Sequence, residues 1–292
     1  MKMLETSTAL VSVTDKSGLA DLAAAFARAG VHILASSGTR SFLAEHGVEA
    51  EEISAYTGSP EILGGRVKTL HPKIHGGILA DRDDPVHVRT LSESGAHAID
   101  FVVVNLYPFE EKYRAGGLSP EEMVEFIDIG GITLMRAAAK NHKHVTVVTH
   151  PSQYADVAGE IAAHGGTTPA LRARLAAEAF ALTATYDAAV SRYMRETAGA
   201  HSLPERVGIG LEKVTDVRYG ENPHQRGALY RTVGRSPLCD MRVLQGKELS
   251  FNNYLDIAGA FALARDLGRG SVAIIKHTNP CGAAWSLSLI HI

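Results

Sequence analysis

The chain has 292 residues, of which 45% are hydrophobic and 21% charged, so it can bury a substantial core and should form about two domains. A net charge of −3 and a pI near 6.5 argue against a nucleic-acid-binding protein, which normally carries a basic face. The two cysteines argue against a disulfide framework and fit a reducing compartment. No apolar run could cross a bilayer or act as a signal core, so we expect a cytoplasmic protein without membrane contact.

The first half of the chain alternates short apolar runs with segments of helical periodicity. Strand followed by helix, repeated, implies a right-handed parallel α/β sheet. In such sheets ligands bind at the carboxyl ends of the strands. We expect strands at residues 8–13, 31–34, 101–104 and 145–148, and helices at about 19–30, 42–47, 120–128 and 133–140.

Two polar turns follow the first two expected strands. Residues 14–18 (TDKSG) and 36–39 (SSGT) offer hydroxyls, free N–H groups and a positive helix end, which favour a bound phosphate. Ordinary N-capping is the alternative interpretation of each turn. Two such turns on one edge favour the phosphate site. Neither a dinucleotide nor a nucleoside triphosphate motif is present.

A basic, glycine-bracketed loop at residues 64–77 contains Arg66, Lys68 and Lys73, and no carboxylate occurs between residues 62 and 80. We therefore expect the balancing charge to come from outside the chain. An arginine can hold a phosphate through two hydrogen bonds, and a lysine acts as a point charge. On this segment alone, a solvated basic loop is an equally good interpretation.

Further polar residues fall near the same edge. Asn105 and Tyr107 directly follow the strand expected at 101–104. Asp128 precedes an expected helix and can simply cap it. Lys140 can simply be a cation in the last turn of that helix, where the dipole favours positive charge.

The fourteen histidines prompt a search for a metal site. His71 with His75, and His142 with His144, are the closest pairs, but no complete ligand motif surrounds them. Their basic neighbours would repel a divalent cation. We therefore expect no metal.

The second half of the chain begins with one long amphipathic helix, expected at residues 168–196. We place the domain boundary near Gly199, which divides the chain into residues 1–199 and 200–292. The second part contains a polar loop at 218–225, a helix after residue 251 and a buried strand at 271–275. The second part contains few residues from which to build the core of an independent domain.

Together these motifs resemble the bifunctional AICAR (5-aminoimidazole-4-carboxamide ribonucleotide) formyltransferase/IMP cyclohydrolase family of purine biosynthesis. The resemblance covers residues 8–284. The segments that carry it are 12–18 (SVTDKSG), 35–39 (ASSGT), 64–72 (GGRVKTLHP), 105–109 (NLYPF), 127–131 (IDIGG), 136–142 (RAAAKNH), 218–225 (RYGENPHQ) and 276–277 (KH).

The resemblance implies a methylglyoxal-synthase-like, Rossmann-type α/β domain followed by the start of a cytidine-deaminase-like α/β transformylase domain. The first domain would close the purine ring of formylated AICAR (FAICAR) to give IMP and water, without a cofactor. The second would transfer a formyl group to AICAR from its co-substrate 10-formyltetrahydrofolate. Members of the family form homodimers.

The resemblance also assigns roles to individual residues. The nucleotide cavity would be lined by Ser12, Thr14, Asp15, Lys16, Ser36, Ser37, Gly38, Thr39, Arg66, Thr69, Asn105, Ile129 and Gly130. The reacting atoms would be surrounded by Lys68, Tyr107, Asp128 and Lys140, with Lys140 as the proton donor and acceptor. In the second domain, Arg218 and Tyr219 would bind AICAR, His277 would be the base and Lys276 would stabilise the transition state.

This chain departs from the family in two ways. Ser37 stands where the family often has glycine, and the last residues, 285–292, do not resemble the family's continuation. We expect a truncated chain with a complete cyclohydrolase domain, while most of the transformylase domain, its folate site and its activity are lost. From the residues alone, it stays open whether Lys68 or Lys140 moves the proton.

Two other functions are compatible with this pattern. A regulatory module that binds a phosphate ligand would keep the basic loop but would not need Tyr107 and Lys140. A methylglyoxal-synthase-type lyase would share the architecture and the phosphate-binding turns, but would leave the second part of the chain without a role.

Overall fold

The computed structural model describes residues 8–199, 203–232 and 238–286. The chain divides into two compact units, residues 1–208 and 209–292. The boundary expected near Gly199 adjoins residues 200–202, which lie outside the described residues, as do residues 287–292 of the atypical C-terminal segment. No described helix combines the length and apolar character needed to span a bilayer.

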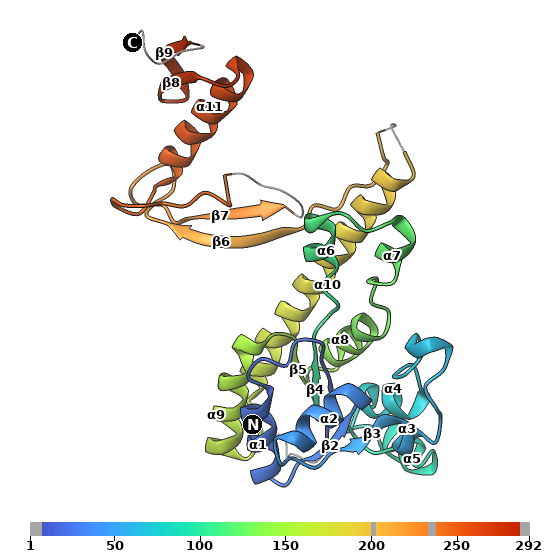
Figure 1. The fold of residues 1–292 in the computed structure, drawn as a ribbon. Coiled ribbons are helices and arrows are strands. Elements are labelled where there is room, and N and C mark those ends of the chain that lie inside the picture. The colour runs from blue at the N-terminus through green and yellow to red at the C-terminus, as the bar shows by residue number, and fades with distance from the viewer. Residues whose placement is uncertain (1–7, 200–202, 233–237, 287–292) are drawn as a thin grey trace. The chain divides into compact units, whose positions relative to one another are not determined.

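The first unit is built on a five-stranded parallel sheet with the strand order β3-β2-β1-β4-β5 (Figure 1). The strands are β1 (Thr8–Ser12), β2 (His32–Ala35), β3 (Glu51–Glu52), β4 (Phe101–Val104) and β5 (Thr146–Val148). The parallel α/β fold expected from the sequence is confirmed. The short β3, which the sequence did not indicate, forms one edge of the sheet.

Helices cover both faces of this sheet. On one side α1 packs against α9, and on the other α8 contacts both α10 and α4. The helices are α1 (Leu19–Arg28), α2 (Ser37–Glu45), α3 (Ile53–Thr57), α4 (Pro72–Leu79), α5 (Pro85–Glu93), α6 (Phe109–Ala115), α7 (Pro120–Val124), α8 (Gly130–Lys140), α9 (Tyr154–His164) and α10 (Pro169–Thr197), with 3-10 turns at Leu63–Gly65 and Pro151–Gln153.

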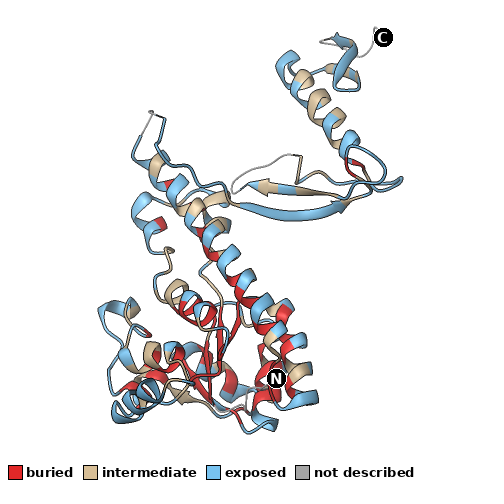
Figure 2. Ribbon diagram, turned by 180° about the vertical axis from the view of Figure 1, so that it is seen from behind, coloured by how far each residue is buried: buried red, intermediate tan, exposed pale blue. Residues whose placement is uncertain are grey.

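The core of the first unit lies between the sheet and these helices (Figure 2). Every residue of β4 is buried, as expected for a central parallel strand covered on both faces. The rings of Phe26 in α1 and Phe101 in β4 lie 5.0 Å apart between centroids. Burying these side chains fixes the strand ends that carry the polar turns.

Three helix boundaries differ from the sequence expectation. Helix α2 begins at Ser37, well before Phe42, because its first turn is polar and shows no apolar periodicity. Helix α8 begins at Gly130 rather than Thr133 for the same reason. Helix α7 has the expected capping box at Ser119, but it ends at Val124 instead of continuing to 128.

Among its described residues, the second unit consists of two antiparallel strand pairs and one helix. Strand β6 (Leu211–Val217) pairs with β7 (Gly227–Thr232), and β8 (Ser271–Lys276) pairs with β9 (Asn279–Trp285), while α11 spans Phe251–Leu267. The strand expected at 271–275 forms, but the prediction that it is buried was wrong. It pairs only with β9 and packs one face on α11, so alternate side chains such as Ile274 are exposed.

Candidate functional site

A cavity of about 530 Å³ opens at the carboxyl ends of β2, β1 and β4, where the sequence places the polar turns. We call it the sheet-edge cavity. The 64–70 loop and the start of α8 complete its wall. Its lining includes Ser12, Val13, Thr14, Lys16, Ser36, Gly38, Thr39, Gly64, Gly65, Arg66, Lys68, Thr69, Leu70, Val104, Asn105, Tyr107, Val124, Glu125, Ile127, Asp128, Ile129, Gly130, Gly131 and Leu134.

Asn105 fixes the first polar turn of the cavity. Its Oδ1 accepts hydrogen bonds from the backbone N–H of Thr14 at 2.6 Å and of Asp15 at 3.2 Å. Its Nδ2 donates to the Asp15 carbonyl at 2.8 Å. One side chain after β4 thus satisfies three backbone groups after β1, and the turn holds Lys16 at the cavity.

A chain of hydroxyls connects the first two strands at the cavity. Ser12 Oγ donates to Ser36 Oγ at 3.3 Å, and Ser36 Oγ donates to Thr39 Oγ1 at 3.2 Å. Thr39 is buried, and its Oγ1 also accepts from the Val13 backbone N–H at 3.3 Å. These contacts place the N-terminus of α2 against the cavity. The N–H groups of Thr39 and Arg40 already donate to the Ser36 carbonyl, at 2.9 and 2.8 Å, so the Gly38 N–H is the helix-start donor in the cavity lining that is left for a ligand.

Two of the three cations of the basic loop, Arg66 and Lys68, have carboxylate partners within the chain. Arg66 pairs with Glu125, and Lys68 Nζ lies 2.8 Å from Glu61 Oε1. The expectation that the balancing charge comes from outside the chain is therefore corrected for this structure. The sequence gap between residues 62 and 80 was misleading, because Glu61 borders it and Glu125 reaches Arg66 through the fold.

Asp128 both caps a helix and lines the cavity. Its Oδ1 accepts the Gly131 backbone N–H at 2.7 Å, so the capping interpretation is correct. Burial raises the pKa of the Asp128 carboxyl. Hydrogen bonds from the backbones of Gly131 and Tyr107 lower this pKa, but the effect of burial is larger. A half-buried carboxyl with a raised pKa inside a cavity is typical of a proton-transfer group.

The Gly130-Gly131 pair lets α8 start close to its neighbours. A Cβ on Gly131 would lie 2.7 Å from Asp128 Oδ2, and a Cβ on Gly130 would lie 3.1 Å from Thr69 Oγ1. Only glycine at these two positions leaves Asp128 and Thr69 in place.

Tyr186 supports the site from outside the cavity. The sequence marked this residue only as an apolar position of a long helix. Its hydroxyl accepts the Asp128 backbone N–H at 2.7 Å and donates to the Phe126 carbonyl at 3.0 Å. A buried tyrosine in an apolar stripe needs a partner for its hydroxyl, and this was the signal available in the sequence.

Three residues expected at the cavity do not line it in this structure. The Asp15 carboxylate is turned to the Ser17 backbone N–H at 2.9 Å, and Ser37 Oγ donates to Glu52 Oε1 at 2.7 Å. Lys140 is exposed at the last position of α8, about 15 Å along the helix from Gly130. The idea that Lys16, Thr39, Lys68 and Lys140 share one cavity thus holds for the first three.

The residues assigned to the second activity lie in the second unit. The Arg218 guanidinium is 4.8 Å from the Tyr219 ring centroid, and the Tyr219 carbonyl accepts the Phe251 N–H at the start of α11. Lys276 and His277 are exposed at the β8–β9 turn, where the Thr278 N–H donates to Asp256 Oδ1 at 2.8 Å. Both pairs therefore adjoin the first two turns of α11.

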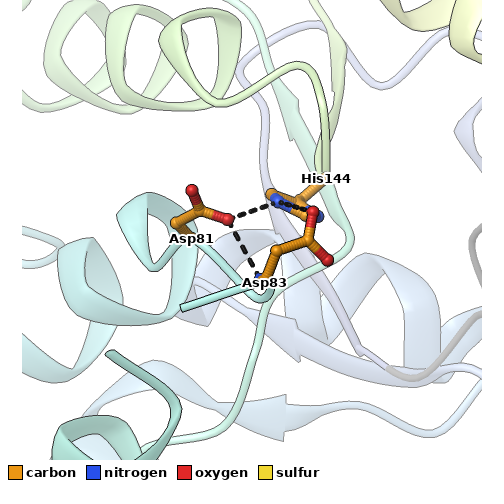
Figure 3. Close-up of side chains that lie close together, drawn as sticks. All are labelled: Asp81, Asp83 and His144. Atoms are coloured by element: carbon orange, nitrogen blue, oxygen red, sulfur yellow. Dashed lines mark hydrogen bonds and ion pairs between the residues drawn. The ribbon is translucent and has the colours of Figure 1, made fainter. Parts of the chain in front are cut away.

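A separate cluster brings together Asp81, Asp83 and His144 (Figure 3). One potential ligand atom from each lies within 4.8 Å of the others. Lys143 Nζ is 2.7 Å from Asp83 and 3.8 Å from Asp81, so an ammonium group already balances the two carboxylates. We assign no metal to this cluster. The sequence missed it because the aspartates precede His144 by about 60 residues.

Comparison with known proteins identifies the family. The profile of the AICARFT/IMPCHase bienzyme family matches residues 138–291, more than half of the chain. The chain belongs to this family. A second profile, the MGS-like domain, matches residues 18–133, the part that contains most of the sheet-edge cavity. The resemblance recognised from the motifs is confirmed.

Relatives of the AICARFT/IMPCHase family match along nearly the whole chain. The bifunctional purine biosynthesis protein PurH of Rhodopirellula baltica is 50% identical over 278 residues, covering 94% of this chain and 53% of the relative. PurH of Chlorobaculum parvum is 48% identical over 289 residues, covering 96% of this chain and 55% of the relative. The chain thus spans about half the length of these relatives.

One solved structure is also similar to this chain. The crystal structure of ForH has a TM-score of 0.58 and 37% sequence identity to this chain, and the match covers 63% of this chain and 95% of that one.

Proposed function

We propose that this chain is an IMP cyclohydrolase that closes the purine ring of FAICAR to give IMP and water. The observation that carries the proposal is the sheet-edge cavity, whose lining includes hydroxyls, two lysines, an arginine, a tyrosine and the half-buried carboxyl of Asp128. This combination can hold an anionic nucleotide and move protons beside it. The relatives named PurH support the same reaction.

The phosphate of the nucleotide would bind between the start of α2 and the basic loop, since Arg66 and Lys68 line the same cavity as Ser36 and Thr39. The hydroxyls of Ser36 and Thr39, the free N–H at the helix start and the ammonium of Lys16 favour a dianion there. No bond to the phosphate is made or broken, so this end of the site serves to position the substrate.

Ring closure would occur near Asp128, Tyr107 and Lys68. The carboxamide nitrogen of FAICAR attacks the formyl carbon and loses one proton, while the former formyl oxygen gains one and becomes a hydroxyl. The C–O bond then breaks, a C=N bond forms to the formamide nitrogen, and the oxygen leaves as water with the proton that this second nitrogen loses. A carboxylate with a raised pKa can accept the proton, and a nearby ammonium can stabilise charge on the oxygen. These side chains supply the chemistry without a cofactor.

The position of Lys68 in the cavity lining supports giving it the charge-stabilising role. The role of Lys140 as proton donor and acceptor remains a proposal from the family resemblance, and so do the binding roles of Asp15 and Ser37.

The other predictions concern the second part of the chain and the assembly. We propose residues 1–199 as the cyclohydrolase domain and 200–292 as part of a transformylase domain, with Arg218, Tyr219, Lys276 and His277 in the roles given above. Transfer of a formyl group from 10-formyltetrahydrofolate to AICAR, homodimer formation and a cytoplasmic location are proposed on the family resemblance, and the location also on the low cysteine content.

The proposal is tested by incubating the purified chain with FAICAR and following the absorbance of IMP. We expect turnover that falls about 10²- to 10⁴-fold in Lys68→Met and is unchanged in Lys112→Met, a lysine outside the cavity lining. IMP binding without turnover would favour the regulatory module. Release of methylglyoxal from a triose phosphate would favour the lyase.

A further inference from the structure

Both cations of the basic loop that line the sheet-edge cavity are held by carboxylates from outside that loop. Glu125, at the end of α7, pairs with Arg66, and Glu61, before the loop, pairs with Lys68. All four side chains are partly exposed, with relative exposures between 37% and 65%. These are accessible ion pairs that a solvated ligand can reach.

The Glu61–Lys68 pair depends on the shape of the loop. Gly65 has φ of +93°, and a Cβ there would lie 2.5 Å from Glu61 Oε1 and 2.9 Å from Lys68 Cε. The two side chains therefore meet directly over the glycine backbone. An antiparallel bridge between Ile62 and Val67 closes the loop and brings Glu61 opposite Lys68.

The same cations face the cavity. Arg66, Lys68 and Glu125 all line the sheet-edge cavity, while Lys68 also lines a small adjacent hollow that contains Glu61. An anion that enters the cavity and approaches Arg66 Nη2 or Lys68 Nζ competes with Glu125 or Glu61 for the positive charge of that group.

We propose that Glu61 and Glu125 are displaceable counter-ions of the sheet-edge cavity. They neutralise Lys68 and Arg66 while the cavity is empty, and the phosphate-bearing ligand exchanges with them on binding. A ligand that takes the place of these carboxylates breaks their ion pairs, so the carboxylates lower its affinity and speed its release. This inference rests on the proposed function, because that function makes the ligand a phosphate monoester.

The experiment uses two probes, IMP and inorganic phosphate, with inosine as the ligand that lacks the phosphate. Binding is measured by titration calorimetry for the wild type, Glu61→Gln and Glu125→Gln. Glu121→Gln is the matched control. Glu121 lies on α7, the helix that ends next to Glu125, and its substitution changes the net charge by the same amount. Glu121 has no ion-pair partner among the described residues. Circular dichroism confirms that each variant is folded.

We expect each of Glu61→Gln and Glu125→Gln to tighten phosphate binding by about 1.4- to 5-fold, the range for releasing an exposed ion pair. The gain should shrink as salt is raised, and inosine binding and Glu121→Gln should be unchanged. If either variant leaves phosphate affinity unchanged or weaker, or if no variant binds phosphate, the proposal is overturned. If phosphate binding tightens but IMP does not bind, the counter-ion role stands and the proposed cyclohydrolase function fails.

Discussion

The Tyr186 hydroxyl accepts a hydrogen bond from the Asp128 backbone N–H at 2.7 Å and donates one to the Phe126 carbonyl at 3.0 Å. Burial raises the pKa of Tyr186 to about 12, so the phenol stays neutral and keeps its donor proton at physiological pH. The long helix α10 thereby fixes the loop that delivers Asp128 to the sheet-edge cavity.

Tyr186→Phe should destabilise the fold and weaken catalysis together. The substitution leaves the Asp128 N–H and the Phe126 carbonyl without their partner, which costs about 1–3 kcal/mol of the free energy of unfolding. Urea titration measures this loss. Tyr193→Phe on the same helix is the control, because the described residues provide no hydrogen bond to the Tyr193 hydroxyl. Equal stability of the two variants would contradict the role of Tyr186.

Asp128→Asn should raise stability at neutral pH while reducing turnover of FAICAR. Burial raises the pKa of Asp128 in the folded state, so ionisation costs free energy in the fold that it does not cost in the unfolded chain. This penalty is present above the folded-state pKa and disappears as the pH falls through it. Asparagine keeps an acceptor for the Gly131 N–H but carries no charge.

Thermal unfolding as a function of pH checks this prediction. The variant should melt above the wild type at pH 7, and the two curves should converge below about pH 4, while turnover is lower by about 10²- to 10⁴-fold. A variant that melts lower than the wild type at pH 7 would show that the Asp128 carboxylate stabilises the fold.

Gly131→Ala should impair catalysis with little effect on stability. The new Cβ would lie 2.7 Å from Asp128 Oδ2, so the carboxyl must move. A displacement of about 1 Å can cost up to 10²-fold in rate. Gly159→Ala in α9 is the matched control, since a Cβ there meets nothing within 4 Å. The control should stabilise the fold by about 0.5–1 kcal/mol and leave turnover unchanged. Equal turnover of both variants would contradict the prediction.

Arg172→Met should destabilise the first unit strongly. The buried guanidinium donates to the carbonyls of His142 at 2.9 Å, Lys143 at 2.8 Å and Thr167 at 2.5 Å. Removing it leaves these carbonyls without their donor and should cost about 3 kcal/mol or more. Arg174→Met, which breaks only exposed ion pairs, should cost less than about 1 kcal/mol. Denaturant unfolding measures the free energy of unfolding of both variants. Similar losses in the two variants would contradict the role of Arg172.

The sheet and its ligand edge could be predicted because the signals are local. The valine-rich run of β4 and the turns after β1 and β2 are short segments, and the rules of parallel topology place their ends together. Asn105 was placed at the right edge on this basis. Its hydrogen bonds to the 14–15 turn, 90 residues earlier, needed the structure.

What could not be predicted depends on contacts between distant segments. Glu125 reaches Arg66 across 59 residues, and Tyr186 reaches Asp128 across 58. No periodic pattern or motif in the sequence identifies the partner in either contact. The burial of β8 was mispredicted because an apolar run cannot show how many neighbours its strand will have.

The most direct test of the central claim is to locate bound IMP on the chain. Backbone amide shifts would be recorded by NMR during titration with IMP. We predict the largest changes within segments 36–39, 66–69 and 128–131, whose residues other than Ser37 and Val67 line the sheet-edge cavity. Saturable binding with changes confined to surfaces outside that cavity would contradict the account.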